Sequence, residues 1–172
     1  IEFIKQDKLD AQSSTAMQEL RNNSQAMVAQ LSDTIWVLKK DVRSITGISD
    51  RLKILIRRLQ PSYPAIKIEV QEKLEKDTIL PASQAYHLFL IIQEALNNAL
   101  KHSRCRNVFI VLESNAVNRI AIIDDGAGFT ESDTADNAGN GLSNMKSRAA
   151  QAGWHITWQP NKPSGTIVML DD

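Results

Sequence analysis

One stretch, Gln93 to His102, constrains this 172-residue chain more than any other. It lies late in an apolar helical run, yet it contains an acid, two asparagines, a lysine and a histidine. Steps of three and four residues bring side chains to one face of a helix. A polar stripe is therefore expected opposite an apolar face, made of Glu94, Asn97, Asn98, Lys101 and His102. The sequence predicts a helix that lies on a core and presents a functional surface.

Composition narrows the class of protein. The chain is 42% hydrophobic and 23% charged, which is ordinary for a soluble globular protein. Its 20 Lys and Arg residues balance its 20 Asp and Glu residues, so we expect neither nucleic acid nor an anionic membrane as a partner. The single Cys105 excludes an internal disulfide. No apolar run reaches the ~18 residues of a membrane span.

The N-terminal residues have the pattern of a coiled coil. Residues 1–40 contain no Pro or Gly, and a seam of alternating three- and four-residue steps runs through them. The seam consists of Met17, Leu20, Ser24, Met27, Leu31, Thr34 and Leu38. It predicts a long helix that packs on a partner helix. We favour half of a dimeric helical bundle; the alternative is a two-helix appendage buried on its own domain.

Gly47 interrupts this pattern, so we place a hinge between Asp41 and Gly47. The expected division is a helical bundle remnant with its linker in residues 1–44, followed by a folded domain in residues 45–172. Because the chain begins at Ile1, we also expect it to be a fragment of a longer protein.

The rest of the chain mixes strand and helix patterns. Ser49 is placed to cap a helix that ends before Pro61. Further helices are expected at 82–102 and 141–152, and strands at 66–70, 107–113, 119–124, 154–159 and 166–170. Residues 130–140 are polar, small and acidic, which predicts a mobile loop. This order predicts an α+β fold, a two-layer sandwich in which helices cover one face of a mixed, mostly antiparallel sheet.

The first glycine turn follows the strand that ends at Asp124. An acid in that position, with Gly126 and Gly128 after it, allows a sharp turn and close backbone approach by a ligand. The carboxylate could accept a hydrogen bond from an exocyclic amine such as that of adenine. Asp-Asp-Gly is also a common turn, which is the structural alternative.

A second glycine turn, Gly139-Asn140-Gly141-Leu142, enters a helix, and free N–H groups at a helix N-terminus suit phosphate. The alternative is a flexible loop. The spacing matches neither the lysine-bearing P-loop nor the dinucleotide fingerprint. The third turn, Ser164-Gly165-Thr166, indicates only a hairpin when taken alone.

The polar stripe itself allows metal and phosphate chemistry. Mg²⁺ prefers hard oxygen ligands and shares them with phosphates, so the amide oxygen of Asn98 would be enough. Glu94, one turn earlier, could orient or deprotonate a nucleophile. Lys101 could reach a phosphate as a point charge. The alternative is a solvated face with a carboxamide network.

Taken together and in order, the segments QEALNNALKHS, DDGAGF, GNGL and SGT resemble a known set of motifs. They are similar to the N box and the three glycine boxes of the ATPase superfamily shared by gyrase, heat-shock chaperones, MutL-type repair proteins and sensor histidine kinases. The resemblance covers roughly residues 60–172. The form of the N box and the segment GLSNMKSRAAQAG resemble the nitrate-sensor-type subfamily of sensor histidine kinases, and LSDTIWVLKKD resembles the second helix of its dimeric bundle.

The resemblance implies a role for each matching position. Asn98 would be the Mg²⁺ ligand, Glu94 the base or polariser, and Asp124 the anchor for adenine. The other nucleotide-binding positions implied are Asn97, Lys101, His102, Gly126, Gly128, Gly139, Gly141, Leu142 and Thr166. The implied cofactors are ATP and Mg²⁺.

The family's phosphoacceptor is a histidine in an arginine-rich context on the first bundle helix. The chain has only His87, His102 and His155, none of them in such a context, so we expect the acceptor upstream of Ile1. The implied protein is a cytoplasmic kinase region that forms a homodimer through its N-terminal helices and passes phosphate to a response regulator. Any membrane anchor would lie in segments of the parent outside this chain.

Two other functions stay open. One is a non-catalytic nucleotide-binding or protein-interaction module, that is, a pseudokinase. The other is a serine kinase of the same superfamily that acts on an anti-sigma-factor antagonist, which the bundle-like N-terminal segment disfavours.

Overall fold

The computed structural model describes residues 17, 44–128 and 140–172, except for the side chain of Asn140. The expected coiled-coil seam, apart from the exposed Met17, lies outside the described residues, as do Gly139 and nearly all of the expected loop 130–140. The described residues from Ser44 onward belong to one compact unit, residues 39–172. The expected division at residues 44 and 45 stays a prediction.

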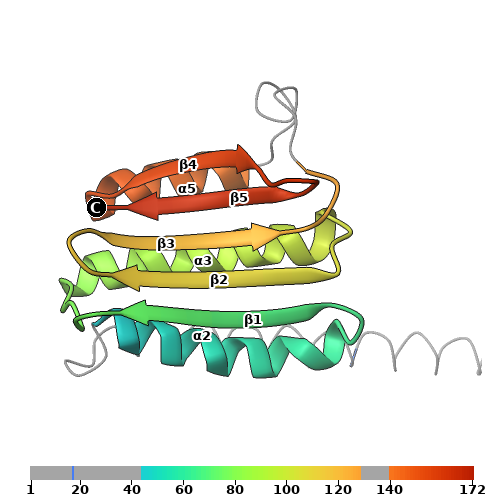
Figure 1. Ribbon diagram of the computed structural model, residues 1–172, viewed down its shortest axis with the longest axis horizontal. Helices are drawn as coiled ribbons and strands as arrows, with labels where there is room; N and C mark the ends of the chain where they lie inside the picture. Colours follow the sequence, from blue (N-terminus) through green and yellow to red (C-terminus); the bar gives the residue numbers. More distant parts are fainter. Residues whose placement is uncertain (1–16, 18–43, 129–139) are drawn as a thin grey trace, which may run out of the picture. The chain divides into compact units, whose positions relative to one another are not determined.

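A five-stranded sheet carries all the described helices on one face (Figure 1). The helices are α2 (Ile45–Leu59), the 3₁₀ turn η2 (Gln60–Ser62), α3 (Ala82–His102) and α5 (Asn140–Ala152). The strands are β1 (Lys67–Leu74), β2 (Asn107–Ser114), β3 (Asn118–Asp124), β4 (His155–Pro160) and β5 (Thr166–Asp171), in the order β1-β2-β3-β5-β4. Only β1 and β2 pair in parallel. The predicted mixed, mostly antiparallel two-layer α+β fold is therefore confirmed.

The core lies between the sheet and the helices. Along β2 every second residue is buried, which is the pattern of a strand with one covered face. The apolar face of α3 meets it with Leu88, Ile92 and Leu96, all fully buried. Burying a side chain of this size contributes about 1.5–3 kcal/mol. This packing fixes the rotation of α3, so the opposite side of the helix is determined as well.

The start of α2 differs from the sequence prediction. The helix begins at Ile45, and Ser44 caps it by accepting a hydrogen bond on its Oγ from the Gly47 N–H at 3.1 Å. Gly47 is therefore a buried residue of the first turn of α2. Residues 41–43 of the expected hinge lie outside the described residues. Ser49 is buried inside the helix and donates its hydroxyl to Glu72, so the expectation that it caps the helix was wrong. The apolar face of α2 extends one turn further toward the N-terminus, to Ile45, so the helix begins before Ser49.

The topology brings three chain segments to one end of the sheet. Helix α3 ends there, β2 begins there and β3 ends there, on the right-hand side of Figure 1. We call this the Asp124 end. The opposite end holds Lys76 and the turn of residues 115–117. Within the described residues, no helix combines the length and apolarity that a membrane crossing requires.

Candidate functional site

Asp124 is a buried carboxylate at the end of a strand. It is the last residue of β3 and only 7% exposed. Its Oδ1 accepts a hydrogen bond from the Gly126 N–H at 2.9 Å, and its main-chain oxygen accepts one from Asn161 Nδ2 at 2.9 Å. Among residues 44–128 and 140–172, no donor reaches Oδ2. A ligand N–H group can therefore bind that second oxygen without displacing a contact from these residues.

Close backbone packing holds the turn that follows Asp124. A side chain at Gly126 would meet the main chain and side chain of Ser103, whose carbonyl accepts the Ala127 N–H at 2.8 Å. A side chain at Gly165 would meet the carbonyl of Asp124, and Gly165 has φ +109°. Gly128 lies against Gly165 in turn. The first and third glycine turns of the sequence therefore form one packed unit.

Asp125 fixes this turn to the start of β2. Its Oδ1 accepts the N–H groups of Arg106 and Asn107 at 2.8 and 2.9 Å, and its Oδ2 accepts Asn107 Nδ2 at 2.7 Å. These donors, first the Asn107 N–H, hold the pKa of Asp125 below its usual value. Sequence reasoning gave this residue no role.

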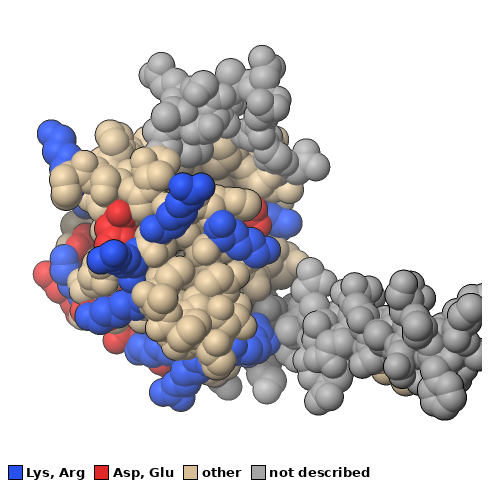
Figure 2. Space-filling view, turned by 90° about the vertical axis from the view of Figure 1, so that its right-hand side faces the viewer, with Lys and Arg blue, Asp and Glu red and all other residues tan. Residues whose placement is uncertain are grey.

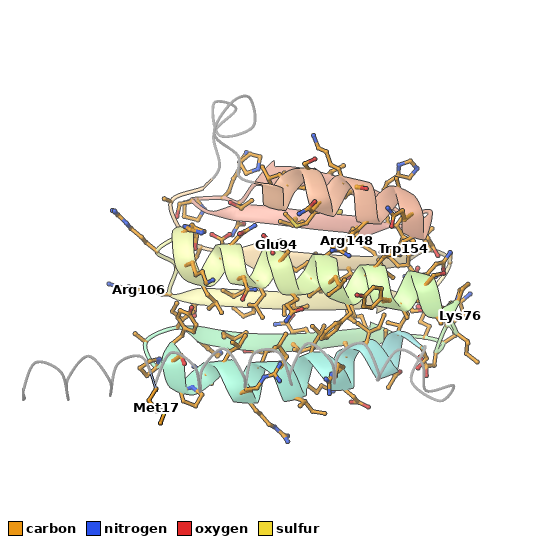
Figure 3. All side chains as sticks on the ribbon, turned by 180° about the vertical axis from the view of Figure 1, so that it is seen from behind. Met17, Lys76, Glu94, Arg106, Arg148 and Trp154 are labelled. Atoms are coloured by element: carbon orange, nitrogen blue, oxygen red, sulfur yellow. The ribbon has the colours of Figure 1, made fainter. Side chains whose placement is uncertain are left out.

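Helix α5 begins against the polar stripe of α3. A Cβ atom at Gly141 would lie 2.5 Å from Glu94 Oε1 and 3.9 Å from Asn98 Nδ2. Figure 3 shows Glu94 where α3 faces α5. The absence of a side chain at Gly141 lets the first turn of α5 approach the two predicted catalytic and metal-binding side chains. Leu142, next in the chain, is half-buried.

The other predicted site residues are placed as follows. Asn97 is half-buried, whereas Lys101 and His102 are exposed in the last turn of α3. Thr166 begins β5, one residue beyond the pair Ile123–Ile167, and therefore lies across from Asp124. Gly139 lies outside the described residues. The structure thus groups Asp124, Gly126, Gly128 and Thr166 at the end of β3, and Glu94, Asn98 and Gly141 between α3 and α5.

Three contacts around the site had no signal in the sequence. Asn161, Ser164 and Ser103 all bind the 124–127 turn, Ser164 by donating its hydroxyl to the carbonyl of Asp125 at 3.2 Å. Asn and Ser beside a glycine also suit an ordinary turn. Only the tertiary structure shows that they contact a distant segment.

The donor set between α3 and α5 suits a hard cation that shares its ligands with phosphate. Among the described residues, no three His, Cys, Asp or Glu side chains lie close enough together to hold a metal ion by themselves. Glu94 and Asn98 supply carboxylate and amide oxygens one turn apart. These are the oxygen donors that Mg²⁺ prefers, and Mg²⁺ takes its remaining ligands from water and phosphate.

Comparison with known proteins identifies relatives. Residues 83–171 match the family described as histidine kinase-, DNA gyrase B- and HSP90-like ATPases. The sensor histidine kinase LiaS of Bacillus subtilis is 30% identical over 132 residues, which cover 74% of this chain and 35% of the relative. The nitrate/nitrite sensor protein NarX of Escherichia coli is 25% identical over 166 residues, covering 95% of this chain and 27% of the relative. The chain thus spans about a third of these relatives' length.

Solved structures share the fold. The histidine kinase domain of a blue-light activated histidine kinase from Erythrobacter litoralis superposes with a TM-score of 0.61 at 25% identity, covering 74% of this chain and 59% of that one. The ATP-binding domain of PrrB from Mycobacterium tuberculosis gives a TM-score of 0.58 at 20% identity, covering 73% and 90%. The second similarity concerns the fold alone.

The contact between Gly165 and Asp124 can be tested against a matched glycine. Gly165→Ala adds a methyl group against the Asp124 carbonyl at a positive φ, whereas Gly153→Ala, also at positive φ (+71°), meets only Gln84 Nε2 at 4.0 Å. We expect Gly153→Ala to lower the free energy of unfolding by about 1 kcal/mol and Gly165→Ala by at least about 2 kcal/mol more. Urea unfolding measures both. Equal losses would contradict the proposed close packing.

The Asp125 contacts predict a pH-dependent contribution. Because the folded pKa is lowered, the stabilisation is present above the ordinary pKa of 3.8 and is lost as pH falls through the folded pKa. At pH 7, Asp125→Ala should lower the unfolding free energy by about 0.5–1.5 kcal/mol, the low end for such contacts, because Asp125 is exposed and solvent screens its hydrogen bonds. The difference from the wild type should shrink near pH 2. Urea unfolding at both pH values tests this, with Asp171→Asn as control; a difference independent of pH would exclude the ionised contacts as its cause.

Proposed function

The chain belongs to the family of histidine kinase-, DNA gyrase B- and HSP90-like ATPases, and on that premise we propose that residues 45–172 are the ATP-binding catalytic domain of a sensor histidine kinase. The observation that carries the proposal is the meeting of α5 with α3 at Gly141, Glu94 and Asn98, beside the Asp124 turn. Relatives named sensor histidine kinases support the choice among the activities of the family.

In this proposal Asp124 selects the base. Its Oδ2, which no donor of the described residues reaches, accepts the exocyclic amine of adenine, while Gly126 and Gly128 shape the site and Thr166 supports it from the neighbouring strand. The carboxylate is buried, so a base that offers no N–H there would leave a charged oxygen unpaired. Such mismatches cost about 1–3 kcal/mol, which is enough to discriminate between purines.

The phosphates would lie where the first turn of α5 meets the polar stripe of α3. The first turn of α5 presents main-chain N–H groups near Gly141, and the positive end of its helix dipole lies there too. Lys101 adds a charge from the last turn of α3, with Asn97 and His102 nearby. Asn98 offers an amide oxygen to Mg²⁺, which when bound would neutralise phosphate charge.

Glu94 is the proposed general base or polariser. It is half-buried on α3 and faces the start of α5, one turn before Asn98. A carboxylate there can accept a proton from, or orient, the imidazole nitrogen that attacks the γ-phosphate. The products are then a phosphohistidine and ADP.

The wider proposal concerns the parent protein. Residues 1–44 are the remnant of a dimerisation and phosphotransfer bundle with its linker, and the parent forms a homodimer through these helices. The acceptor histidine lies upstream, the phosphate passes to an aspartate of a response regulator, and the kinase region works in the cytoplasm. The named relatives, which extend well beyond this chain, support this reading.

Nucleotide binding tests the proposal directly. Isothermal titration of the chain with ADP or ATP should show saturable binding that Mg²⁺ strengthens. Asp124→Asn should weaken binding by about 1–3 kcal/mol, because the amide cannot serve the amine equally well. Asp171→Asn, at the far end of β5, is the control. A folded chain that binds neither nucleotide would refute the proposal, and an unchanged affinity for Asp124→Asn would mean that the base lies elsewhere.

A second variant separates a kinase from a pseudokinase. In the parent protein, Glu94→Gln should lower the rate of histidine phosphorylation by about 100-fold or more, the scale of lost general base catalysis, while ADP affinity stays within about threefold. Glu75→Gln, in the loop after β1, serves as control and should change neither quantity. A wild-type parent that binds ATP without phosphorylating any histidine would instead support the non-catalytic module.

A further inference from the structure

The charges of the domain separate along the sheet although the chain is neutral overall. Figure 2 looks at the Asp124 end and shows many Lys and Arg side chains across the middle and lower part of this face, with most of the Asp and Glu side chains toward its left and a smaller acidic patch right of centre. A neutral composition therefore hides a strongly polarised surface.

The topology explains why cations gather there. Helices α2 and α3 both end at the Asp124 end with basic last turns, and β1 and β2, which pair in parallel, both start there. The segment that joins α3 to β2 adds two arginines, Arg104 and Arg106. The described cations at this end are Arg57, Arg58, Lys67, Lys101, Arg104, Arg106 and Lys162.

The cations around the start of β1 and the α3–β2 junction have few carboxylate partners among the described residues. Lys67 pairs with Glu69 at 2.8 Å, but no described carboxylate lies within 4.0 Å of Lys101, Arg104 or Arg106. Asp125 is nearby and exposed, and its hydrogen bonds come from neutral donors, so its charge subtracts from that of the cations. The seven cations still outnumber the carboxylates of Glu69, Asp124 and Asp125. Asp124 is buried. The exposed potential at this end is therefore positive.

The opposite end has the reverse balance. Its described acids are Glu75, Asp77, Glu113, Asp171 and Asp172, and its cations are Lys73, Lys76 and Arg119. Lys73 and Arg119 both lie near Glu113, at 2.9 and 3.9 Å. The field of the domain thus points along the sheet, with its positive end at the proposed nucleotide pocket.

We propose that Arg104 and Arg106 steer the polyphosphate of the incoming nucleotide, as long-range charges that do not touch it in the bound state. The inference rests on the proposed ATP-binding function and extends it to two residues outside the motifs. Both side chains are exposed, and Arg106 lies at the outer margin of this end, opposite Lys76 (Figure 3). The main chain of Arg106 stabilises the fold, because its N–H donates to Asp125 and its carbonyl accepts the Lys67 N–H. Arg104 has φ +56°.

Charge, and not shape, is what such residues recognise. Exposed charges act over the Debye length, which is about 30 Å at 10 mM salt and about 3 Å at 1 M. Steering raises association rates by about 10- to 1,000-fold when a whole surface contributes, and it leaves dissociation nearly unchanged. A neutral nucleoside gains nothing from it.

The test compares two double variants of equal charge change. Arg104→Gln with Arg106→Gln removes the steering pair and leaves every main-chain contact possible. Lys76→Gln with Arg119→Gln is the matched control at the opposite end. Stopped-flow kinetics with a fluorescent ADP, and with adenosine carrying the same fluorophore, measure association and dissociation at low and high salt with Mg²⁺ held constant.

We expect the Arg104 and Arg106 double variant to bind the fluorescent ADP about 3- to 10-fold more slowly near 10 mM salt and as fast as the wild type near 1 M. Dissociation should change by less than about twofold. The control pair and the adenosine probe should show no such slowing. Unchanged association at low salt would overturn the inference while leaving ADP binding intact. A faster dissociation would indicate direct contact and overturn it as well, and absence of ADP binding in the wild type would overturn it together with the proposed function.

Discussion

The candidate site depends on one close approach of main chains. The carbonyl of Asp124 packs against Gly165, and the next turn packs through Gly126 on Ser103. These contacts join the end of β3 to the β4–β5 turn on one side and to the end of α3 on the other. Side chains of any size at the two glycines would separate the three segments. The burial of Asp124 follows from this packing.

Helix α3 links that turn to the rest of the domain. Its apolar face packs on the sheet with Leu88, Ile92 and Leu96, which fixes the direction in which Glu94 and Asn98 point. Helix α5 lies beside α3 on the same face of the sheet, and the absence of a side chain at Gly141 lets its first turn approach Glu94 closely. Core packing and the geometry of the site are therefore linked, because a rotation of α3 that changed the packing of its apolar face would also move Glu94 and Asn98.

How much could be predicted from sequence depends on the distance over which each signal acts. The bounds of α3 and of the β2–β3 hairpin were predicted closely, because periodicity and turn residues are local. The predicted N-cap of α2 was wrong. Ser49 is a residue type that often caps helices, but the helix begins earlier, at Ile45, whose side chain is buried in the core. Asp125 received no role because its partners are main-chain N–H groups 18 and 19 residues away, which have no sequence signature. The charge separation could not be seen in the composition, because the net charge of the chain is zero.

The proposed nucleotide site includes three carboxylates, Glu94, Asp124 and Asp125, which would repel a polyanion. Their different surroundings reduce this repulsion. Asp125 is turned toward main-chain donors, which compensate its charge locally. Asp124 is buried at the end where a base, and not a phosphate, would lie. Of the three, Glu94 faces the start of α5, where the N–H groups of the helix end offset its charge. The exposed margin can then be basic, so attraction at long range and selectivity at short range come from different residues of the same end.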